Sequence, residues 1–229
     1  MIGGKPTAKA AGLTVTYRDE IYNKISSIPE GELFRAEVIT QDADHLADDF
    51  TTLRDHDYLH VVDGWLTGIV ETKYLRRSPK LSLVLSSYKE IMDCDLVPTG
   101  DRTAYEMGYR QWEPLQGYRF YTDGESRLLT IGALKVRIIH TPEWIRDLSE
   151  VGQMLRVLYD TPEKEIPETV ARMKASGKVA QEDFEKAHVL ATSISNDHYS
   201  ETSSSEFRDP TQVTSLVMSY LTQKKDHKS

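Results

Sequence analysis

The sequence is poor in cysteine and has no long apolar run. Cys94 is the one cysteine among 229 residues, which excludes an internal disulfide and argues against a structural zinc cluster. No segment approaches the roughly 18 consecutive apolar residues that a membrane-spanning helix requires. The first twelve residues also lack the apolar stretch of a secretion signal. We therefore expect a soluble, cytoplasmic protein that is not associated with a membrane.

The sequence also lacks the short motifs that mark common active sites. It contains no glycine-rich phosphate loop, no Gly-x-Ser-x-Gly elbow and no His-Glu-x-x-His pair. The nearby acids Asp123 and Glu125 could suggest general acid–base chemistry, but an Asp-Gly pair in a polar turn accounts for Asp123 without it. We expect no enzymatic activity, no catalytic residue, no cofactor and no metal site.

Positive charge is scarce overall but locally concentrated. The chain has 28 Lys and Arg against 36 Asp and Glu, a net charge of −8. Proteins that neutralise DNA phosphates usually have a basic surface, so the total charge counts against DNA binding. Residues 42–57, however, contain six Asp and a single Arg, whereas residues 73–80 contain four cations and no acid: Lys73, Arg76, Arg77 and Lys80.

The amino-terminal third predicts a flexible arm over residues 1–12 and a winged helix-turn-helix over residues 13–72. Apolar residues recur with helical spacing over 19–28, 33–40 and 42–57. β-branched and aromatic residues then flank Asp63-Gly64, a pair that favours a two-residue hairpin turn. In a winged helix the third helix enters the major groove and the ribbon contacts the DNA backbone. Because the third helix is acidic here, it could instead bind a protein partner.

Residues 13–17 support an alternative, because Leu-Thr-Val-Thr-Tyr alternates with the period of a strand. A strand followed by two helices is the order of a ribbon-helix-helix protein, in which paired strands of two subunits enter the major groove. Thr14, Thr16 and Arg18 would then face the bases. This alternative leaves the Asp63-Gly64 hairpin without a role.

The middle of the chain predicts a small mixed α/β domain over residues 81–160. An apolar run at 81–85 precedes expected helices over 86–92 and 103–109. Three strand-like segments follow, at 118–121, 127–131 and 134–140, and we expect them to form a three-stranded meander. If the register agrees, four cations share one side of this sheet, either as a solvated face or as a nucleic-acid platform: Arg119, Arg127, Lys135 and Arg137.

The last part, residues 161–229, predicts a helical extension. Before it, apolar residues recur with helical spacing from Trp144 to Leu158. Within it, helical spacing returns over 179–193, residues 196–209 have the composition of an exposed loop, and Pro210 begins a last helix. Helices without another evident role often form subunit contacts, so we expect a homodimer. The chain as a whole is predicted to belong to the α+β class.

Two blocks of sequence resemble the AbiEi-type antitoxin family, which is associated with bacterial type IV toxin–antitoxin modules and mobile elements. The first block runs from Ile25 to Phe34, with Asp63-Gly64-Trp65-Leu66 downstream. The second contains Val97-Pro98-Thr99-Gly100 and Tyr105, then the segments Tyr118–Arg127 and Ile131–His140. The likeness spans roughly residues 19–160, and its most specific part is Tyr-Thr-Asp-Gly-x-Ser-Arg, which runs from Tyr121 to Arg127.

The resemblance implies a transcriptional regulator that acts on promoter DNA, and such antitoxins commonly repress their own operon and counter a nucleotidyltransferase toxin. We predict a DNA-binding regulator of a bacterial mobile element that binds double-stranded DNA as a homodimer. An antitoxin-like module that neutralises a toxin is the alternative. The predicted contacts to DNA phosphates are Lys73, Arg76, Arg77 and Lys80, to which Arg119, Arg127, Lys135 and Arg137 add.

Overall fold

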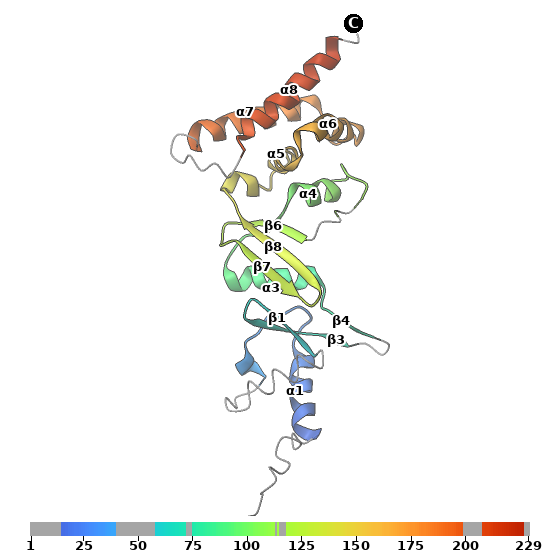
Figure 1. Cartoon of the computed structure of the whole chain (residues 1–229), viewed down its shortest axis with the longest axis vertical. Coiled ribbons are helices and arrows are strands. Elements are labelled where there is room, and N and C mark those ends of the chain that lie inside the picture. Colours follow the sequence, from blue (N-terminus) through green and yellow to red (C-terminus); the bar gives the residue numbers. More distant parts are fainter. Residues whose placement is uncertain are drawn as a thin grey trace, which may run out of the picture. The chain divides into compact units, whose positions relative to one another are not determined.

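The computed structural model describes residues 15–39, 58–71, 75–112, 114, 118–198 and 208–226 (Figure 1). The chain divides into two compact units. Unit 1 consists of residues 1–93 and 129–135, and unit 2 consists of residues 94–128 and 136–229. Helices and strands occur in both units, which confirms the α+β class.

The first helix of unit 1, α1, covers Val15–Ser27. It confirms the helix predicted over residues 19–28 and begins earlier, at Val15. The strand predicted at 13–17 is therefore wrong from Val15 onward, and the ribbon-helix-helix alternative loses the strand on which it depended. Alternation over so few residues is a weak signal, and the chain forms a helix here that buries Ile21 and Ile25.

A β-hairpin forms at Asp63-Gly64, as predicted. Strands β1 (Leu59–Val62) and β2 (Trp65–Gly68) pair antiparallel, with Val62 opposite Trp65. Asp63 has φ 49° and Gly64 has φ 79°, the positive values that a two-residue hairpin turn needs at both positions. Local conformational preference at these two residues therefore favours this turn.

The segment between α1 and the hairpin differs from the prediction. In place of a helix over 33–40, Phe34 pairs with Leu66 of β2, and only Ala36–Val38 form a short 3-10 helix, η1. The amide and carbonyl of Phe34 bond to Leu66 at 2.9 and 3.0 Å, so neither group is available for an α-helix. The predicted third helix, 42–57, lies outside the described residues, as do the predicted arm and Lys73.

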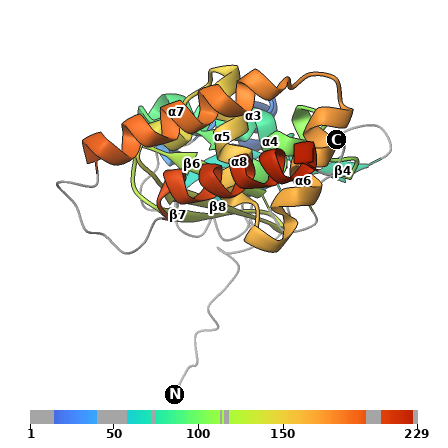
Figure 2. The ribbon, with the colours of Figure 1, turned by 90° about the horizontal axis from the view of Figure 1, so that it is seen from above.

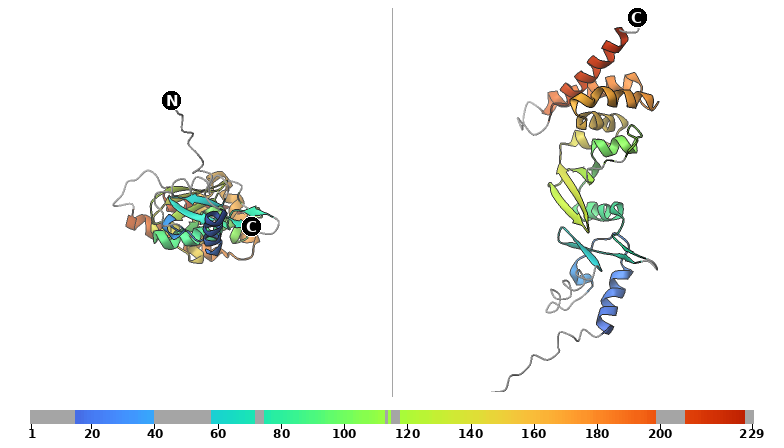
Figure 3. Two further views of the ribbon diagram at one scale, coloured as in Figure 1. Left: turned by 90° about the horizontal axis from the view of Figure 1, so that it is seen from below. Right: turned by 45° about the vertical axis from the view of Figure 1, so that its right-hand side comes forward.

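Three further elements of unit 1 precede residue 93. Strands β3 (Val70–Glu71) and β4 (Arg76–Arg77) pair antiparallel, and α3 covers Leu81–Met92 (Figure 3, right). The apolar run at 81–85 is thus the first part of one helix that continues through the predicted 86–92. One apolar cluster joins α1 to the hairpin: Ile21, Ile25, Phe34, Ile39, Leu59 and Leu66.

One four-stranded sheet contains the three predicted strands in an order that was not predicted. Residues 129–135 of this sheet belong to unit 1 and its other residues belong to unit 2. Strands β5 (Val97–Pro98), β6 (Tyr118–Thr122), β7 (Arg127–Ile131) and β8 (Leu134–His140) lie in the order β5-β6-β8-β7. The meander is therefore wrong, because β6 pairs in parallel with β8 and β7 lies at the edge.

The turn after β6 explains this order. The amide of Gly124 donates to Thr122 Oγ1 at 3.0 Å, and the amide of His140 donates to Ser126 Oγ at 2.8 Å. These bonds hold the turn against the end of β8, where the amide of Thr141 also donates to the carbonyl of Thr122 at 2.9 Å. The edge of β6 is thereby occupied by β8, and β7 cannot pair there.

The helices of unit 2 follow the prediction with one interruption. The helix predicted over 144–158 is divided into a 3-10 helix η2 (Glu143–Arg146) and α5 (Glu150–Asp160), because Ser149 caps α5 by accepting the amide of Gly152 at 3.0 Å. The remaining helices are α4 (Gly100–Glu106), η3 (Glu163–Glu165), α6 (Ile166–Ala175), α7 (Gln181–His198) and α8 (Pro210–Asp226). The helices predicted near 103–109, at 179–193 and from Pro210 are confirmed as α4, α7 and α8.

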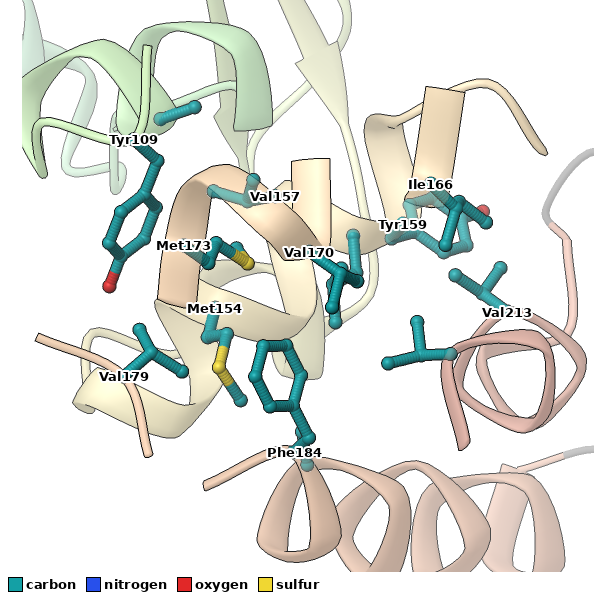
Figure 4. Close-up of a cluster of buried hydrophobic side chains, with 14 of the residues drawn as sticks. Tyr109, Met154, Val157, Tyr159, Ile166, Val170, Met173, Val179, Phe184 and Val213 are labelled. Carbon is teal, nitrogen blue, oxygen red and sulfur yellow. The ribbon is translucent and has the colours of Figure 1, made fainter. Parts of the chain in front are cut away.

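The helices after α5 share one apolar core with the rest of unit 2. Side chains from α5, α6, α7 and α8 point toward one another, among them Met154, Val170, Phe184 and Val213 (Figure 4). Helices α7 and α8 lie side by side over this core (Figure 2). Tyr121 of β6 belongs to the same cluster, so helices α6, α7 and α8 pack as part of unit 2.

Candidate nucleic-acid interface

The cations proposed as phosphate contacts fall into two groups, those with an acid partner and those without. Arg77 belongs to the first group. Its Nη1 and Nη2 donate to Glu30 Oε1 and Oε2 at 2.8 and 3.1 Å, a bidentate pair. The backbone amide of Lys80 donates to the same carboxylate at 2.9 Å. Hydrogen bonds from Arg77 and from the Lys80 amide lower the pKa of Glu30.

Arg76 also has an acid partner. Its Nε donates to Glu71 Oε1 at 3.2 Å, across the β3–β4 pair in which the two residues are opposite each other. The guanidinium lies 4.7 Å from the centre of the Tyr58 ring, and the Tyr22 hydroxyl donates to Glu71. The hydrogen bond from Tyr22, followed in size by the one from Arg76, lowers the pKa of Glu71. Arg76 and Arg77 therefore connect β4 to β3 and to the turn after α1.

Arg127 in unit 2 also has an acid partner. Its Nη2 lies 2.8 Å from Glu125 Oε2 in the turn before β7. By strand alternation its side chain shares one side of β7 with the buried residues Leu129 and Ile131. Exposed Leu128 and Thr130 occupy the other side. Arg127 therefore does not belong with cations that lie on an exposed strand face.

Arg119, Lys135 and Arg137 form the second group, whereas the charge of Lys80 helps to lower the pKa of Glu30. Arg119 and Arg137 lie on different strands. They occupy matching positions in the parallel strands β6 and β8, so their side chains leave the sheet on the same side. Both are exposed. Within the described ranges, neither side chain makes an ion pair or a hydrogen bond with a protein group. We call these two residues the arginine pair.

The strand positions of the arginine pair are fixed by their neighbours. Arg137 lies between Val136 and Ile138, which are almost fully buried on the opposite side of β8. The carbonyl of Arg119 accepts the amide of Thr99 at 3.4 Å, which continues the β5–β6 pairing. Lys135 is exposed and lies two residues before Arg137 on the same side of β8.

The arginine pair places two positive charges side by side. Neighbouring strands lie about 4.8 Å apart, so the two side chains begin close together and repel each other by on the order of 1 kcal/mol in water if the charges come within about 5 Å. Because arginine side chains are flexible, the two guanidinium groups can turn apart in water and so reduce this repulsion. A bound anion removes the repulsion and gains charge-assisted hydrogen bonds as well.

Unit 1 contains two contacts that bear on the proposed wing and that sequence reasoning missed. The Tyr88 hydroxyl of α3 donates to Asp63 Oδ2 at 3.3 Å, so the hairpin tip is tied to α3. Arg35, which is exposed, stacks on Trp65 with its guanidinium 3.8 Å from the ring centre. The partners are 25 and 30 residues apart along the chain, and no local pattern relates them.

A polar cluster inside unit 2 was also missed. Asp160, at the end of α5, accepts the Tyr121 hydroxyl and the Gly100 amide, both at 2.5 Å. Burial raises the pKa of Asp160. Arg156 is buried beside it and donates to the carbonyl of Ile145 at 2.9 Å and to Thr103 Oγ1 at 3.3 Å. These bonds join β6, α4 and α5, so the cluster has a structural role.

The motif that carries the family resemblance has a structural role as well. Asp123 Oδ1 accepts the amide of Asp95 at 2.7 Å, a bond that lowers the pKa of Asp123. Arg146 Nη1 lies 3.4 Å from Asp95 Oδ2 and 3.8 Å from Asp123 Oδ2. The acids are thus used to hold the turn after β6. Among the described residues, no three His, Cys, Asp or Glu side chains are grouped so that they could hold a metal ion.

Comparisons of the chain with protein-family models, with characterised proteins and with solved structures find no significant match. The AbiEi-type resemblance therefore stays a prediction. None of the helices in the described ranges has both the length and the apolar character needed to cross a bilayer.

Proposed function

We propose that the chain is a transcriptional regulator of a bacterial mobile element, in the manner of AbiEi-type antitoxins, and that it binds promoter DNA as a homodimer. The observation that carries the proposal is the arginine pair, Arg119 and Arg137, which is exposed and has no acid partner among the described residues. Lys135 adds a third exposed cation on the same side of β8. Such a group attracts a polyanion locally although the whole chain is acidic.

The arrangement of unit 1 gives further support. Two described elements are compatible with a winged helix, namely helix α1 before the hairpin and the β1–β2 hairpin itself. In this proposal unit 1 supplies the winged helix. The hairpin tip is bonded to Tyr88, so the role of the ribbon in DNA binding would fall to exposed groups along its sides, such as Arg35.

DNA backbone contacts predict a specific dependence on salt. Each phosphate neutralised by a cation contributes a slope of about −0.9 to the dependence of log affinity on log salt concentration. Phosphate contacts fix the position of a protein on DNA without reading its sequence. Loss of the arginine pair should therefore weaken binding to promoter DNA and to unrelated DNA by similar factors.

An antitoxin-like interaction module is the second candidate, and one observation favours it. Arg76 and Arg77, which sequence alone assigned to phosphates, are paired with Glu71 and Glu30. Together with the net charge of −8, this favours a basic protein partner, such as a nucleotidyltransferase toxin. Electrostatic attraction would then act through the acidic parts of the chain.

Fluorescence anisotropy with a labelled duplex from the chain's own upstream DNA tests the proposal. We expect affinity to fall steeply between 50 and 200 mM salt, and Arg119→Ala with Arg137→Ala to weaken binding at both concentrations. Arg172→Ala is the matched control, because Arg172 pairs with Glu168 on α6. Absence of duplex binding at low salt, together with co-purification of a basic protein encoded beside the gene, would favour the second candidate.

A further inference from the structure

The register of β6 and β8 constrains how the arginine pair can bind an anion. Arg119 and Arg137 are partners in the parallel pairing, and the flanking pairs Tyr118–Val136 and Phe120–Ile138 hold the two strands in this register. The two side chains therefore start about 4.8 Å apart and leave the sheet in the same direction. Two guanidinium groups on side chains of this length can both reach one small anion.

The carboxylate of Glu30 in unit 1 shows how several donors can share one anion. Both oxygens of Glu30 are occupied by the two terminal nitrogens of Arg77, at 2.8 and 3.1 Å. Glu30 Oε1 also accepts the backbone amide of Lys80 at 2.9 Å, so a single oxygen of this anion accepts from two residues. The two non-bridging oxygens of a phosphodiester likewise have lone pairs for several donors, and the tetrahedral phosphorus directs them away from a single plane, so two guanidinium groups can donate to one phosphate at once.

We propose that Arg119 and Arg137 together bind a single phosphate group, as one site and not as two independent contacts. This inference rests on the proposed function, in which the phosphate belongs to the DNA backbone. The chemistry that the site recognises is a phosphate oxyanion, which a DNA phosphodiester or free inorganic phosphate could supply. Binding relieves the repulsion between the two cations. When either arginine is removed, there is no repulsion left to relieve, so most of the free energy gained on binding the phosphate is lost.

Shared binding and separate binding predict different salt dependences. If both arginines contact one phosphate, the double variant releases about one counterion fewer than wild type, and the salt slope falls by about 0.9. If they contact two phosphates, the slope falls by about 1.8. The effects on affinity differ as well. Shared binding predicts that each single variant and the double variant all lose about tenfold, whereas independent contacts multiply to about a hundredfold.

The experiment is a double-mutant cycle with R119Q, R137Q and R119Q/R137Q in the full chain, with R172Q as control. Duplex affinity is measured by anisotropy at five salt concentrations, and binding of inorganic phosphate is measured by calorimetry. Circular dichroism melting checks that all variants fold. The shared site is supported if the three variants lose duplex affinity by similar factors and the salt slope of the double variant falls by about 0.9.

The outcomes separate this inference from the proposed function. Duplex binding with additive losses and a slope change near 1.8 overturns the shared site and leaves DNA binding intact. Duplex binding that the variants do not alter overturns any role for the arginine pair. Absence of duplex binding, with phosphate binding that every variant abolishes, supports the shared site and overturns the proposed function. Absence of both kinds of binding overturns both.

Discussion

The ribbon β3–β4 and the strand pair β6–β8 each contain two arginines, but the two pairs differ in whether carboxylates neutralise them. On the ribbon, Arg76 and Arg77 each meet a carboxylate within 3.2 Å. On the sheet, Arg119 and Arg137 are next to each other, with no acid partner in the described part of the chain. The comparison teaches that a basic stretch of sequence is a poor guide to a basic surface. The acids that neutralise it can come from elsewhere in the chain.

Charge reversal of Arg119 and Arg137 should have the largest effect and tests most directly whether the two pairs of arginines differ in function. We expect Arg119→Glu with Arg137→Glu to weaken duplex binding by about a hundredfold or more, because two attractive contacts become repulsive. The thermal midpoint should change little, because both side chains are exposed. Anisotropy and thermal melting measure the two effects. A large fall in the midpoint would mean that these arginines support the fold.

The corresponding change on the ribbon should affect stability and not binding. Arg77→Glu puts a second carboxylate beside Glu30, and we expect the thermal midpoint of unit 1 to fall by a few degrees. Duplex affinity measured below that midpoint should stay within about twofold of wild type. The charge-swapped variant Glu30→Arg with Arg77→Glu should recover most of the midpoint. Failure of this rescue would argue against the ion pair as the cause.

Acid should weaken the ion pairs that Arg76 and Arg77 make. The pKa of Glu30 and the pKa of Glu71 are both below their ordinary value of 4.5 in the folded chain, so the unfolded chain binds more protons under acidic conditions. Their contribution to stability is complete above pH 4.5 and is lost as pH falls through the lowered values. Denaturant melts from pH 7 to pH 3 measure this. Glu30→Gln should make the dependence on pH shallower.

The smallest effect is expected at the hairpin tip. Tyr88→Phe removes the hydroxyl that donates to Asp63 at 3.3 Å, and we expect a loss of stability of about 1 kcal/mol or less. Duplex affinity should not change if the sheet arginines provide the contact. Denaturant unfolding and anisotropy provide the readouts. A tighter complex after this substitution would indicate that a released hairpin tip binds DNA itself.

Sequence reasoning located elements well where local chemistry determines them. The hairpin at Asp63-Gly64 needs positive φ at both residues, and the helix that begins at Pro210 has its proline at a position that tolerates one. Predictions from the sequence were wrong where contacts with distant segments determine the local structure. Residue Phe34 was assigned to a helix because its pairing with Leu66 is not visible along the chain.

The candidate site shows the same division. Alternation correctly placed Lys135 and Arg137 on one side of β8, because a strand determines which of its residues share a side. It could not give the order of strands, and the acid partner of Arg77 is 47 residues away in the sequence. Ion pairing between distant residues is a property of the fold, so the sequence alone could not separate neutralised arginines from available ones.

The parallel pairing of β6 with β8 has a consequence for assembly of the molecule. Residues 119 and 137 become neighbours only after the chain has passed through β7, turned at Gly132 and returned beside β6. The β7–β8 turn can close quickly because it is local, whereas the long-range docking against β6 comes later. In the proposed function, the phosphate site would thus form late, and an incompletely folded chain would lack it.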